Sequence, residues 1–409
     1  MNLNQNYDVF IIGGGPAGAI AAAKLVQSGF KVKLVEKMLF PRFVIGESLL
    51  PRCNFLLDEA NMLECILQAD FQYKPGVAFQ TDNELEIVNF ENNLGESFNS
   101  SFQVKRETFD NELLLDAQRK GVDVEFESEV IEFDAEACII TVKTKSGEIE
   151  RYQSKKIIDA SGYGRVLPRL LGLEKPSEQS MRKAIFCRMT GDVRPLVDGK
   201  DGYIFVDIHD NNQAWLWNIP FNDGVTSVGI VCDEQYFKSF NLTEAEFFDH
   251  IIQTNLSASK RYAQATKMQD VGCINGYSSA VSKLFDKNFV LVGNASEFLD
   301  PVFSSGVTLA LESGAKAAEL TIAELGGQSV DWQADYADYM MVGINVFREY
   351  VNAWYDGRFQ SILFSDDKAE KVSQSVVSVL SGYVWNQENI FVTNPKKMVD
   401  TIYKISITE

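Results

Sequence analysis

Residues 7–18 have the sequence YDVFIIGGGPAG, a short apolar run followed by a glycine-rich turn. Its apolar first half is typical of a strand that is buried on both faces of a parallel sheet. The alanine-rich residues 19–27 then predict a helix, and residues 31–35 form a second β-rich run that Glu36 closes. The chain therefore begins with a predicted β-α-β unit.

The glycines of this unit follow the spacing G-x-G-x-x-G between a strand and a helix. Gly13 permits a tight turn, Gly15 lets the backbone approach a pyrophosphate, and Gly18 lets helix and strand pack closely. Pro16 and Ala17 stand at the start of the helix, where free N–H groups and the positive end of the dipole favour a diphosphate. We expect these five residues to bind a dinucleotide.

Glu36 lies 23 residues after Gly13, at the end of the second strand. A carboxylate there can accept hydrogen bonds from ribose hydroxyls and would repel a 2′-phosphate, so NADP is disfavoured at this site. We place its neighbour Lys37 in the same site. The unit alone does not separate NAD from FAD.

Composition excludes several classes of partner. The 409 residues carry 38 basic and 57 acidic side chains, a net charge of 38 − 57 = −19. So acidic a surface repels phosphate backbones and anionic lipid heads, and we expect no nucleic-acid partner. The length suggests roughly three compact units or a large interleaved pair.

Neither a targeting segment nor a metal site is expected. The most apolar stretch, residues 9–26, contains four glycines, a proline and a lysine, which argues against stable membrane insertion. The six cysteines are scattered without a C-x-x-C pair, as in a cytoplasmic protein with reduced thiols. His209 and His250 have no partner motif, so we interpret both as surface or structural residues and predict no metal.

The remaining pattern predicts an α/β fold: a Rossmann-type domain with an inserted β-rich substrate domain and a helical C-terminal region. Four β-rich runs between 185 and 231, at spacings of roughly eight to twelve residues, favour an antiparallel sheet. Residues 289–292 return to a buried strand, with a helix at 307–325 behind it. We expect a dinucleotide-binding domain in two parts, residues 1–183 and 287–330. A substrate domain at residues 184–286 lies between them, and a helical region at residues 331–409 ends the chain.

Other elements lie between the first unit and the inserted sheet. Residues 49–63 predict a helix, 73–79 and 84–90 predict strands, and 108–120 predict a helix preceded by Arg106.

From about residue 6 to 325 the sequence resembles the flavin-dependent monooxygenase superfamily, which has the FAD fold of p-hydroxybenzoate hydroxylase. The segment Val104-Lys105-Arg106 is similar to the family's arginine segment at the flavin, and Asp159-Ala160-Ser161-Gly162 is similar to its turn beside the adenosine. Val292-Gly293-Asn294-Ala295 stands where the family has Gly-Asp-Ala, so Asn294 replaces the aspartate that meets the ribityl chain. Asparagine still hydrogen-bonds a hydroxyl. The resemblance implies FAD as the cofactor, with Arg106, Asp159, Ala160, Gly162, Gly293 and Asn294 among its contacts.

Within the superfamily, the sequence most resembles the flavin-dependent halogenases and their geranylgeranyl-reductase-like relatives. FPR and GESLLP (residues 40–42 and 46–51) are similar to the halogenase loop along the flavin. WLWNIP (215–220) fits their W-x-W-x-I-P motif, and FLDPVFSSG (298–306) fits F-x-x-P-x-x-S-x-G. The resemblance adds these expected flavin contacts: Arg42, Glu47, Ser48, Pro301, Ser305, Gly306 and Val307.

Two of these motifs also have simpler explanations. Trp215 and Trp217 point to one face of a strand and make a large apolar wall, which could be plain core or could separate substrate from flavin, with Pro220 beside it. The turn before Gly306 could be an ordinary helix cap, or, as in the halogenases, could hold a halide among backbone N–H groups.

Lys74 is the predicted catalytic residue. Residues 74–79, KPGVAF, resemble a Lys-x-Gly-x-x-Phe segment of phenol-type halogenases, whose lysine directs hypohalous acid, or a chloramine made from it, to the substrate. The alternative is a solvated strand lysine. Phe303 occupies the position of a glutamate in tryptophan halogenases, so tryptophan is not the expected substrate.

The resemblance implies an FAD-dependent oxidoreductase of the halogenase type, using reduced FAD, oxygen and halide on an aromatic substrate of phenol or pyrrole type. A hydroxylating monooxygenase, a reductase of isoprenoid-like alkenes and a non-catalytic redox flavoprotein remain alternatives. No second dinucleotide fingerprint is present. The electrons that reduce FAD are therefore expected to come from NAD(P)H that binds transiently or from a separate flavin reductase.

Overall fold

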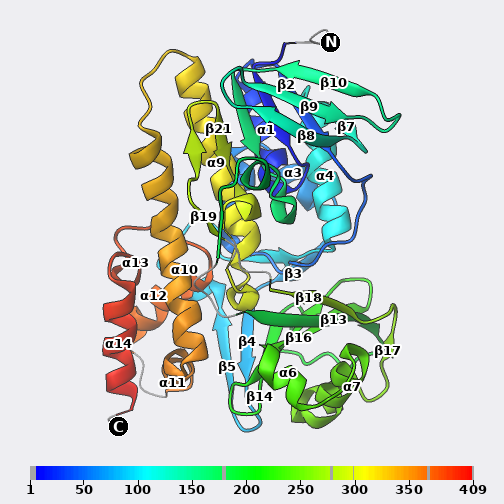
Figure 1. The fold of residues 1–409 in the computed structure, drawn as a ribbon. Helices are drawn as coiled ribbons and strands as arrows, with labels where there is room; N and C mark the ends of the chain where they lie inside the picture. Colours follow the sequence, from blue (N-terminus) through cyan, green and yellow to red (C-terminus); the bar gives the residue numbers. More distant parts are fainter. Residues whose placement is uncertain (1–5, 177–180, 277–279, 298, 366–368, 408–409) are drawn as a thin grey trace.

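The computed structural model describes residues 6–176, 181–276, 280–297, 299–365 and 369–407. It has the predicted α/β architecture, with two sheet-based units and a helical C-terminal region along one side (Figure 1). The described part of the chain begins at the top of the first unit and ends at the opposite end of the molecule.

The first unit is built on a sheet whose central strands are parallel. Strand β1 (Val9–Ile12) lies between β11 (Lys156–Asp159) and β2 (Val32–Glu36), and all three strands are buried throughout. Helix α1 (Pro16–Gln27) follows β1, so the β-α-β unit is confirmed. The outer strands are β7 (Asp123–Phe126), β21 (Phe289–Leu291) and β20 (Phe285–Asp286).

Small residues let two helices approach closely behind this sheet. Helix α9 (Ser305–Leu325) packs on α1, and a Cβ at Gly314 would come within 2.3 Å of the Ala17 carbonyl oxygen. Helix α4 (Arg106–Arg119) packs on α1 as well. A small antiparallel sheet, whose side chains share a core cluster with β1, is formed by β8 (Glu129–Asp134), β9 (Ile139–Lys143) and β10 (Ile149–Gln153).

The second unit contains the predicted antiparallel strands. Strand β13 (Arg182–Thr190) pairs with β16 (Val225–Asp233), which pairs with β15 (Ala214–Pro220). Strand β14 (Ile204–His209) continues the sheet, and short strands β17 (Thr266–Lys267) and β18 (Gly272–Asn275) lie at its other edge.

Two strands from earlier in the chain complete this sheet. β4 (Gly76–Gln80) pairs in parallel with β14, and β5 (Leu85–Asn89) pairs with β4. The expected single strand at 73–79 is therefore wrong. Pro75, which has no N–H to donate, separates β4 from β3 (Gln72–Lys74), and β3 pairs instead with β6 (Ser101–Gln103).

Helices also occur where the sequence suggested mainly strands. Between residues 234 and 261 the chain forms three helices, and their apolar side chains share a core with one face of the second sheet. Helix α7 (Glu244–Thr254) begins with a capping box between Thr243 and Glu246. The other two are α6 (Glu234–Ser239) and α8 (Leu256–Arg261).

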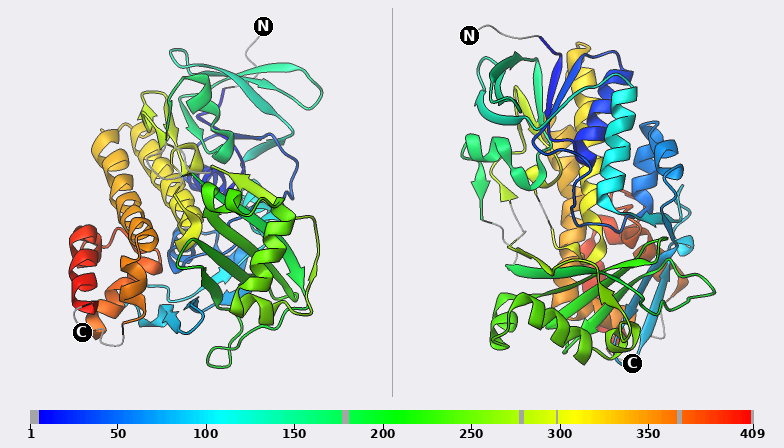
Figure 2. Two further views of the ribbon diagram at one scale, coloured as in Figure 1. Left: turned by 60° about the horizontal axis from the view of Figure 1, so that its bottom comes forward. Right: turned by 90° about the vertical axis from the view of Figure 1, so that its right-hand side faces the viewer.

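The C-terminal region is helical, as predicted. A π-helical turn at Gln333–Asp338 leads into α10 (Tyr339–Tyr355), which runs beside α9 in both views of Figure 2. The following helices are α11 (Arg358–Leu363), α12 (Glu370–Leu380), α13 (Ile390–Thr393) and α14 (Pro395–Ser406). None of the described helices is both long enough and apolar enough to span a bilayer.

The predicted helix at 49–63 is divided in two. Helix α2 (Pro51–Glu59) ends before Asn61, whose φ of 54° interrupts the helix, and α3 (Leu63–Leu67) follows. The short elements α5 (Val166–Leu170), β12 (Glu174–Lys175) and β19 (Ala280–Val281) complete the connection between the units.

Candidate functional site

A cavity of about 410 Å³ extends from the carboxyl ends of β1 and β2 to the second sheet. Of the twenty residues predicted to bind the cofactor, seventeen line it: Gly13, Gly15, Pro16, Ala17, Glu36, Lys37, Arg42, Glu47, Ser48, Arg106, Ala160, Gly162, Gly293, Asn294, Pro301, Gly306 and Val307. These residues come from segments far apart in the sequence. The chain therefore folds to bring the predicted motifs into one elongated site.

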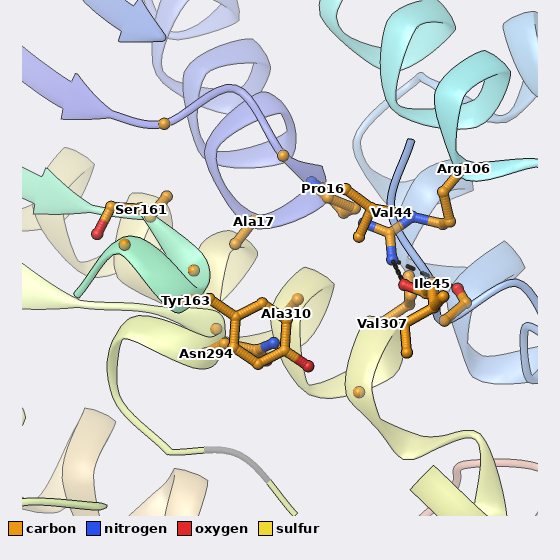
Figure 3. Close-up of a pocket in the computed structure, with 18 of the residues that line it drawn as sticks. Pro16, Ala17, Val44, Ile45, Arg106, Ser161, Tyr163, Asn294, Val307 and Ala310 are labelled. Atoms are coloured by element: carbon orange, nitrogen blue, oxygen red, sulfur yellow. Dashed lines mark hydrogen bonds between the residues drawn. The ribbon is translucent and has the colours of Figure 1, made fainter. Parts of the chain in front are cut away.

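The start of α1 forms a cradle for a phosphate. Gly13 has a φ of 99°, and a Cβ there would lie 2.5 Å from the Ala160 carbonyl oxygen, so the tight turn requires glycine. A Cβ at Gly15 would meet only the Arg42 side chain, at 3.6 Å, because this position faces the cavity. Pro16 and Ala17 lie beside it at the helix start (Figure 3). The arrangement fits a diphosphate on the helix N-terminus.

Glu36 organises the turn around this cradle. Its carboxylate accepts hydrogen bonds from the backbone N–H of Gly14, at 2.8 Å, and of Met38, at 2.9 Å. Carboxylate oxygens have further lone pairs, so the predicted ribose contact is compatible with both bonds. Lys37 also lines the cavity, but its ammonium group pairs with Glu129, at 2.7 Å.

Two arginines hold the loop that follows. Arg106 binds Asp110 through two hydrogen bonds of 2.7 and 3.0 Å and donates to the Ile45 carbonyl oxygen at 3.1 Å. Arg42 reaches the same Asp110 carboxylate at 3.0 Å. Both guanidinium groups are thus fixed beside the cavity, where they can face an electron-rich cofactor.

Three predicted contacts are not among the described residues that line the cavity. Gly18 has the packing role expected of it, because a Cβ there would lie 2.0 Å from the Gly13 carbonyl oxygen. Asp159 is fully buried and accepts the N–H groups of Ser161 and Leu167, and burial raises the pKa of its carboxyl. Ser305 is buried in the first turn of α9.

The turn before α9 faces the far end of the cavity. Ser304 stands at the N-cap of α9 with a φ of 56°. Its hydroxyl makes no capping hydrogen bond, so it does not cap the helix in the ordinary way. Ser304, Gly306 and Val307 line the cavity. Phe298, the first residue of this motif, lies outside the described residues.

Other lining residues were not predicted. The turn at 128–130 reaches the cavity because β7 pairs with β2, and the Ser128 N–H donates to the Glu36 carbonyl oxygen. Tyr163 extends into the cavity close to Asn294 in Figure 3. Ile204, Ile219 and Ile274 close the end near the second sheet. No local motif marks these positions; only the tertiary fold brings them in.

The two predicted wall tryptophans line the cavity from β15. Their ring centroids lie 6.1 Å apart, and both residues are buried. The Trp217 ring packs directly on Gly229 of β16, since a Cβ at Gly229 would come within 2.1 Å of it. Pro220, at the end of β15, is not among the described lining residues.

Lys74 lies outside the cavity lining and is only 1% exposed. The alternative of a solvated strand lysine is therefore wrong. Its Nζ donates a hydrogen bond to the Leu49 carbonyl oxygen at 2.7 Å and lies 5.1 Å from the centre of the Phe90 ring. Burial lowers the pKa of this amine to about 7.

Three polar residues follow Lys74 on paired strands in the direction of the cavity. Lys74 pairs with Ser101 across β3 and β6. Gln103, two residues further along β6, forms an isolated antiparallel β-bridge with Ser48. Residues paired across strands share a face, so the four side chains lie on one face. Ser48 lines the cavity, and the hydroxyls of Ser48 and Ser101 and the Oε1 atom of Gln103 are buried without a hydrogen-bond partner among the described residues.

The cysteines and histidines take no visible part in the site. All six cysteines are free thiols, and five of them are buried. His209 is partly buried, which lowers its pKa, and the His250 ring lies 5.2 Å from that of Phe240. Within the described ranges, no group of three or more His, Cys, Asp or Glu side chains is placed to hold a metal ion.

The sequence is similar to those of known flavin-dependent halogenases. The family profile described as tryptophan halogenase matches residues 8–92 and 83–398. The pyrrole-2-carbonyl peptidyl-carrier-protein chlorinase of Pseudomonas fluorescens is 29% identical over 97% of this chain and 93% of its own length. The tryptophan 2-halogenase of Chondromyces crocatus is 32% identical over 80% of this chain and 63% of its own length.

A solved structure is closer still in sequence. The flavoprotein/dehydrogenase of Cytophaga hutchinsonii is 40% identical, with a TM-score of 0.95 and coverage of 99% of both chains. The chain therefore belongs to the tryptophan halogenase family of flavin-dependent enzymes. It is an FAD-dependent oxidoreductase of the halogenase type, and the cradle at Gly15 and the arginine-held loop fit its cofactor, FAD.

Proposed function

We propose that this protein halogenates an electron-rich aromatic ring, with Lys74 as the catalytic residue. The observation that supports this assignment most strongly is the state of the amine. It is buried, its pKa is near 7, and no carboxylate among the described residues pairs with it. A buried lysine held by a single carbonyl oxygen keeps a large neutral fraction at pH 7, so its lone pair is available for chemistry.

The cofactor and the side chains divide the work. Bound reduced FAD supplies the activation of oxygen that turns chloride or bromide into hypohalous acid. The cradle at Gly15, the loop held by Arg106 and the turn at Asn294 would hold this cofactor. The free N–H groups at the start of α9 are suited to the halide, because they combine unpaired donors with the positive end of the helix dipole.

Hypohalous acid then has a polar route to the amine. The unpartnered groups of Ser48, Gln103 and Ser101 follow one another from the cavity to Lys74, and each can exchange hydrogen bonds with a small polar molecule. At the amine, a nitrogen–halogen bond replaces an N–H bond and water leaves. The aromatic carbon next takes the halogen and its proton returns to the nitrogen, so the amine is regenerated.

The tryptophans separate the organic substrate from the flavin in this proposal. Trp215 and Trp217 close the cavity with two indole rings, so a ring compound near Lys74 does not meet the cofactor directly. Excluding water and substrate from the flavin limits hydrolysis and hydroxylation.

A pyrrole or phenol is the substrate class we favour. The Pseudomonas chlorinase, which covers nearly the whole of both chains, acts on a pyrrole-2-carbonyl group held by a carrier protein. Phe303 occupies the position of the tryptophan halogenases' glutamate and packs edge-on against Tyr350 and Phe359, so an indole nitrogen would find no carboxylate there.

We further propose a cytoplasmic enzyme that obtains reduced FAD from a separate NAD(P)H-dependent flavin reductase.

The test is a mass spectrum of products from reduced FAD, oxygen, bromide and a panel of phenols and pyrroles, free and carrier-bound. Halogenation predicts the bromine isotope doublet and its loss in Lys74→Met. A hydroxylated product without bromide would instead identify a monooxygenase, and an alkene reduced without oxygen would identify a reductase. No turnover with any substrate would favour a redox flavoprotein without catalysis.

A further inference from the structure

Each wall tryptophan donates its indole N–H to a hydroxyl that begins a row of buried or half-buried polar groups, here called a relay. Trp215 donates to the Tyr355 hydroxyl at 2.9 Å, and that hydroxyl donates to the Asp300 carboxylate at 2.8 Å. Burial and the neighbouring carboxylate raise the pKa of Tyr355 well above its usual value, so the hydroxyl keeps its proton. The Arg182 guanidinium stacks on the Tyr355 ring at 3.2 Å and lies 3.7 Å from Asp300.

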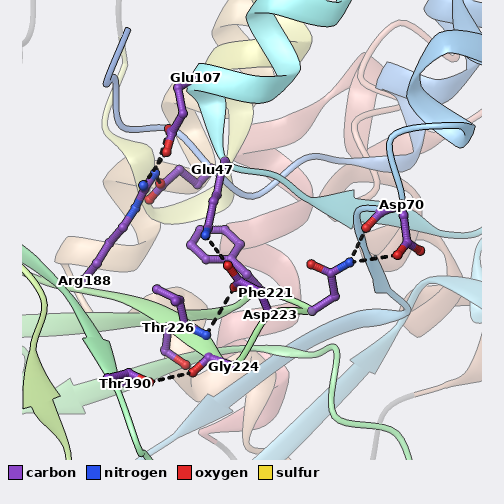
Figure 4. Close-up of polar contacts among 12 residues, drawn as sticks. Glu47, Asp70, Glu107, Arg188, Thr190, Phe221, Asp223, Gly224 and Thr226 are labelled. Carbon is purple, nitrogen blue, oxygen red and sulfur yellow. Dashed lines mark hydrogen bonds and ion pairs between the residues drawn. The ribbon is translucent and has the colours of Figure 1, made fainter. Parts of the chain in front are cut away.

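The second tryptophan has a relay of the same construction. Trp217 donates to the Ser227 hydroxyl at 3.2 Å. Burial raises the pKa of the Glu47 carboxyl, and Arg188 and the Ser227 side chain next to it favour its charged form. Arg188 binds Glu47 at 2.5 Å and also binds Glu107, as Figure 4 shows. In both cases the order is indole, hydroxyl, buried carboxylate and arginine.

The two relays end on segments that line the flavin cavity. Glu47 lies in the lining itself, and Asp300 directly precedes Pro301 and accepts the Val302 N–H at 3.1 Å, which fixes the turn before α9. Both carboxylates are 2% exposed. Both arginines come from β13, six residues apart, so one strand of the second sheet supports both relays.

A general need for every buried indole N–H to have a hydrogen-bond partner does not explain the two relays. The chain has five tryptophans, and two of the other three, Trp332 and Trp354, have a buried indole N–H with no partner in the described structure. Trp385 donates directly to the Tyr339 carbonyl oxygen. Relays through a hydroxyl to a carboxylate therefore occur at the wall.

We propose that Tyr355 and Ser227 are positioning residues that lock the wall tryptophans to the two flavin-lining segments. This inference rests on the proposed function of the wall. A flavin segment that shifts would move its carboxylate and, through the hydroxyl, the indole, so the barrier stays in register with the cofactor. Neither hydroxyl touches the substrate or reacts.

Double-mutant cycles test the relays without relying on turnover. The first cycle combines Trp215→Phe with Tyr355→Phe, and the second combines Trp217→Phe with Ser227→Ala. Within a cycle, the Tm loss of the double variant should be smaller than the sum of the single losses, because one hydrogen bond is removed twice. Across the cycles, Tyr355→Phe and Ser227→Ala should add.

The role of the relays is tested by the product partition, which is the amount of free hypohalous acid and peroxide released per flavin oxidised. With FAD loaded, Tyr355→Phe and Ser227→Ala should each raise free hypohalous acid and peroxide per flavin oxidised by about 2- to 10-fold, the worth of one hydrogen bond, with FAD affinity unchanged. Tyr350→Phe and Ser381→Ala are matched controls, because each removes a buried hydroxyl that has no hydrogen-bond partner among the described residues. Both controls should leave the partition at the wild-type value.

Additive cycles would overturn the relays, and coupled cycles with an unchanged partition would overturn their positioning role. A wild type that makes no halogenated product while the cycles remain coupled would instead overturn the proposed function and leave the tethering in place. The two failures are therefore distinguishable.

Discussion

The Nζ atom of Lys74 donates a hydrogen bond of 2.7 Å to the carbonyl oxygen of Leu49. Leu49 directly follows Ser48, which lines the flavin cavity, although Lys74 itself does not. The amine is therefore fixed relative to the flavin loop while remaining outside the cofactor site. Such a placement suits a group that receives a small molecule made at the flavin and passes it on.

Lys74→Met should abolish halogenated product while leaving FAD binding and oxygen consumption intact. Methionine keeps most of the stem and removes the nitrogen, and losing a directed catalytic group costs about 10²–10⁴ in rate. The measurements are brominated product by mass spectrometry and flavin reoxidation by absorbance. Lys156→Met is the matched control, since Lys156 is also 1% exposed but binds Glu324 and the Lys287 carbonyl oxygen instead. Wild-type product from Lys74→Met would remove this lysine from the mechanism.

The rate of halogenation should rise with pH and level off above a pKa near 7. Burial lowers the Lys74 pKa to about 7, and only the neutral amine above that pH has the lone pair that bonds halogen. The profile is measured under single turnover with preformed hypobromous acid, so that steps at the flavin do not contribute. A rate that falls through pH 7 would assign the ammonium form as a hydrogen-bond donor instead.

The same shift predicts a dependence of stability on pH. In the unfolded chain the lysine has its ordinary pKa near 10.4, so between pH 7 and 10 the unfolded state binds a proton that the folded state does not. Stability from this group therefore increases as pH rises through that window. Chemical denaturation should show a shallower pH slope in Lys74→Met than in wild type, and identical slopes would contradict the buried neutral amine.

Gly15→Val should prevent FAD binding without unfolding the protein. A Cβ at this position has free space and points towards the cavity, so the branched side chain occupies the place of the diphosphate. The flavin absorbance of purified protein and its circular dichroism are the readouts. A normally folded variant with a full complement of FAD would show that the phosphates bind elsewhere.

The β-α-β unit and most of the cofactor site could be predicted because their determinants are local. Strand, glycine loop and helix follow one another within residues 7–27, and the turn geometry of Gly13 is a property of the residue itself. The pairing of β4 with β14 could not be predicted in this way. It joins Val77 to Ile204 in parallel, and no local pattern specifies a partner so distant in the sequence.

Burial was the other property that the sequence could not supply. Lys74 stands in a run that suits an exposed strand, and its enclosure depends on the Leu49 loop and on Phe90. The relays from Trp215 and Trp217 likewise join residues from four separate segments each. Side chains that meet only in the folded state leave no spacing to recognise.

Trp215→Ala should both destabilise the protein and weaken the barrier. Truncating a large buried aromatic residue costs about 3–5 kcal/mol, and the cavity left behind opens the flavin site towards the second unit. Stability alone would support only a core role. The barrier is tested by the ratio of hydroxylated to halogenated product in folded protein, which should rise. An unchanged ratio would mean that Trp215 only packs.

Gly229→Ala should displace Trp217 although the substituted residue itself does not line the cavity. The new Cβ would lie 2.1 Å from Cζ2 and 2.3 Å from Cη2 of the indole, a distance that atoms do not tolerate, and both strands beneath are fixed by their ladder. The ring must therefore move off β16 and lose its 3.2 Å bond to Ser227.

We expect this variant to lose about 1–3 kcal/mol of stability from overpacking, and to change the emission of the wall tryptophans. Product partition should shift as in Ser227→Ala, because both changes release the same indole. Adding Trp217→Phe to Gly229→Ala should not restore the wild-type partition, since the indole N–H is then absent altogether. A folded Gly229→Ala protein with native emission and native products would show that the ring does not lie across this strand.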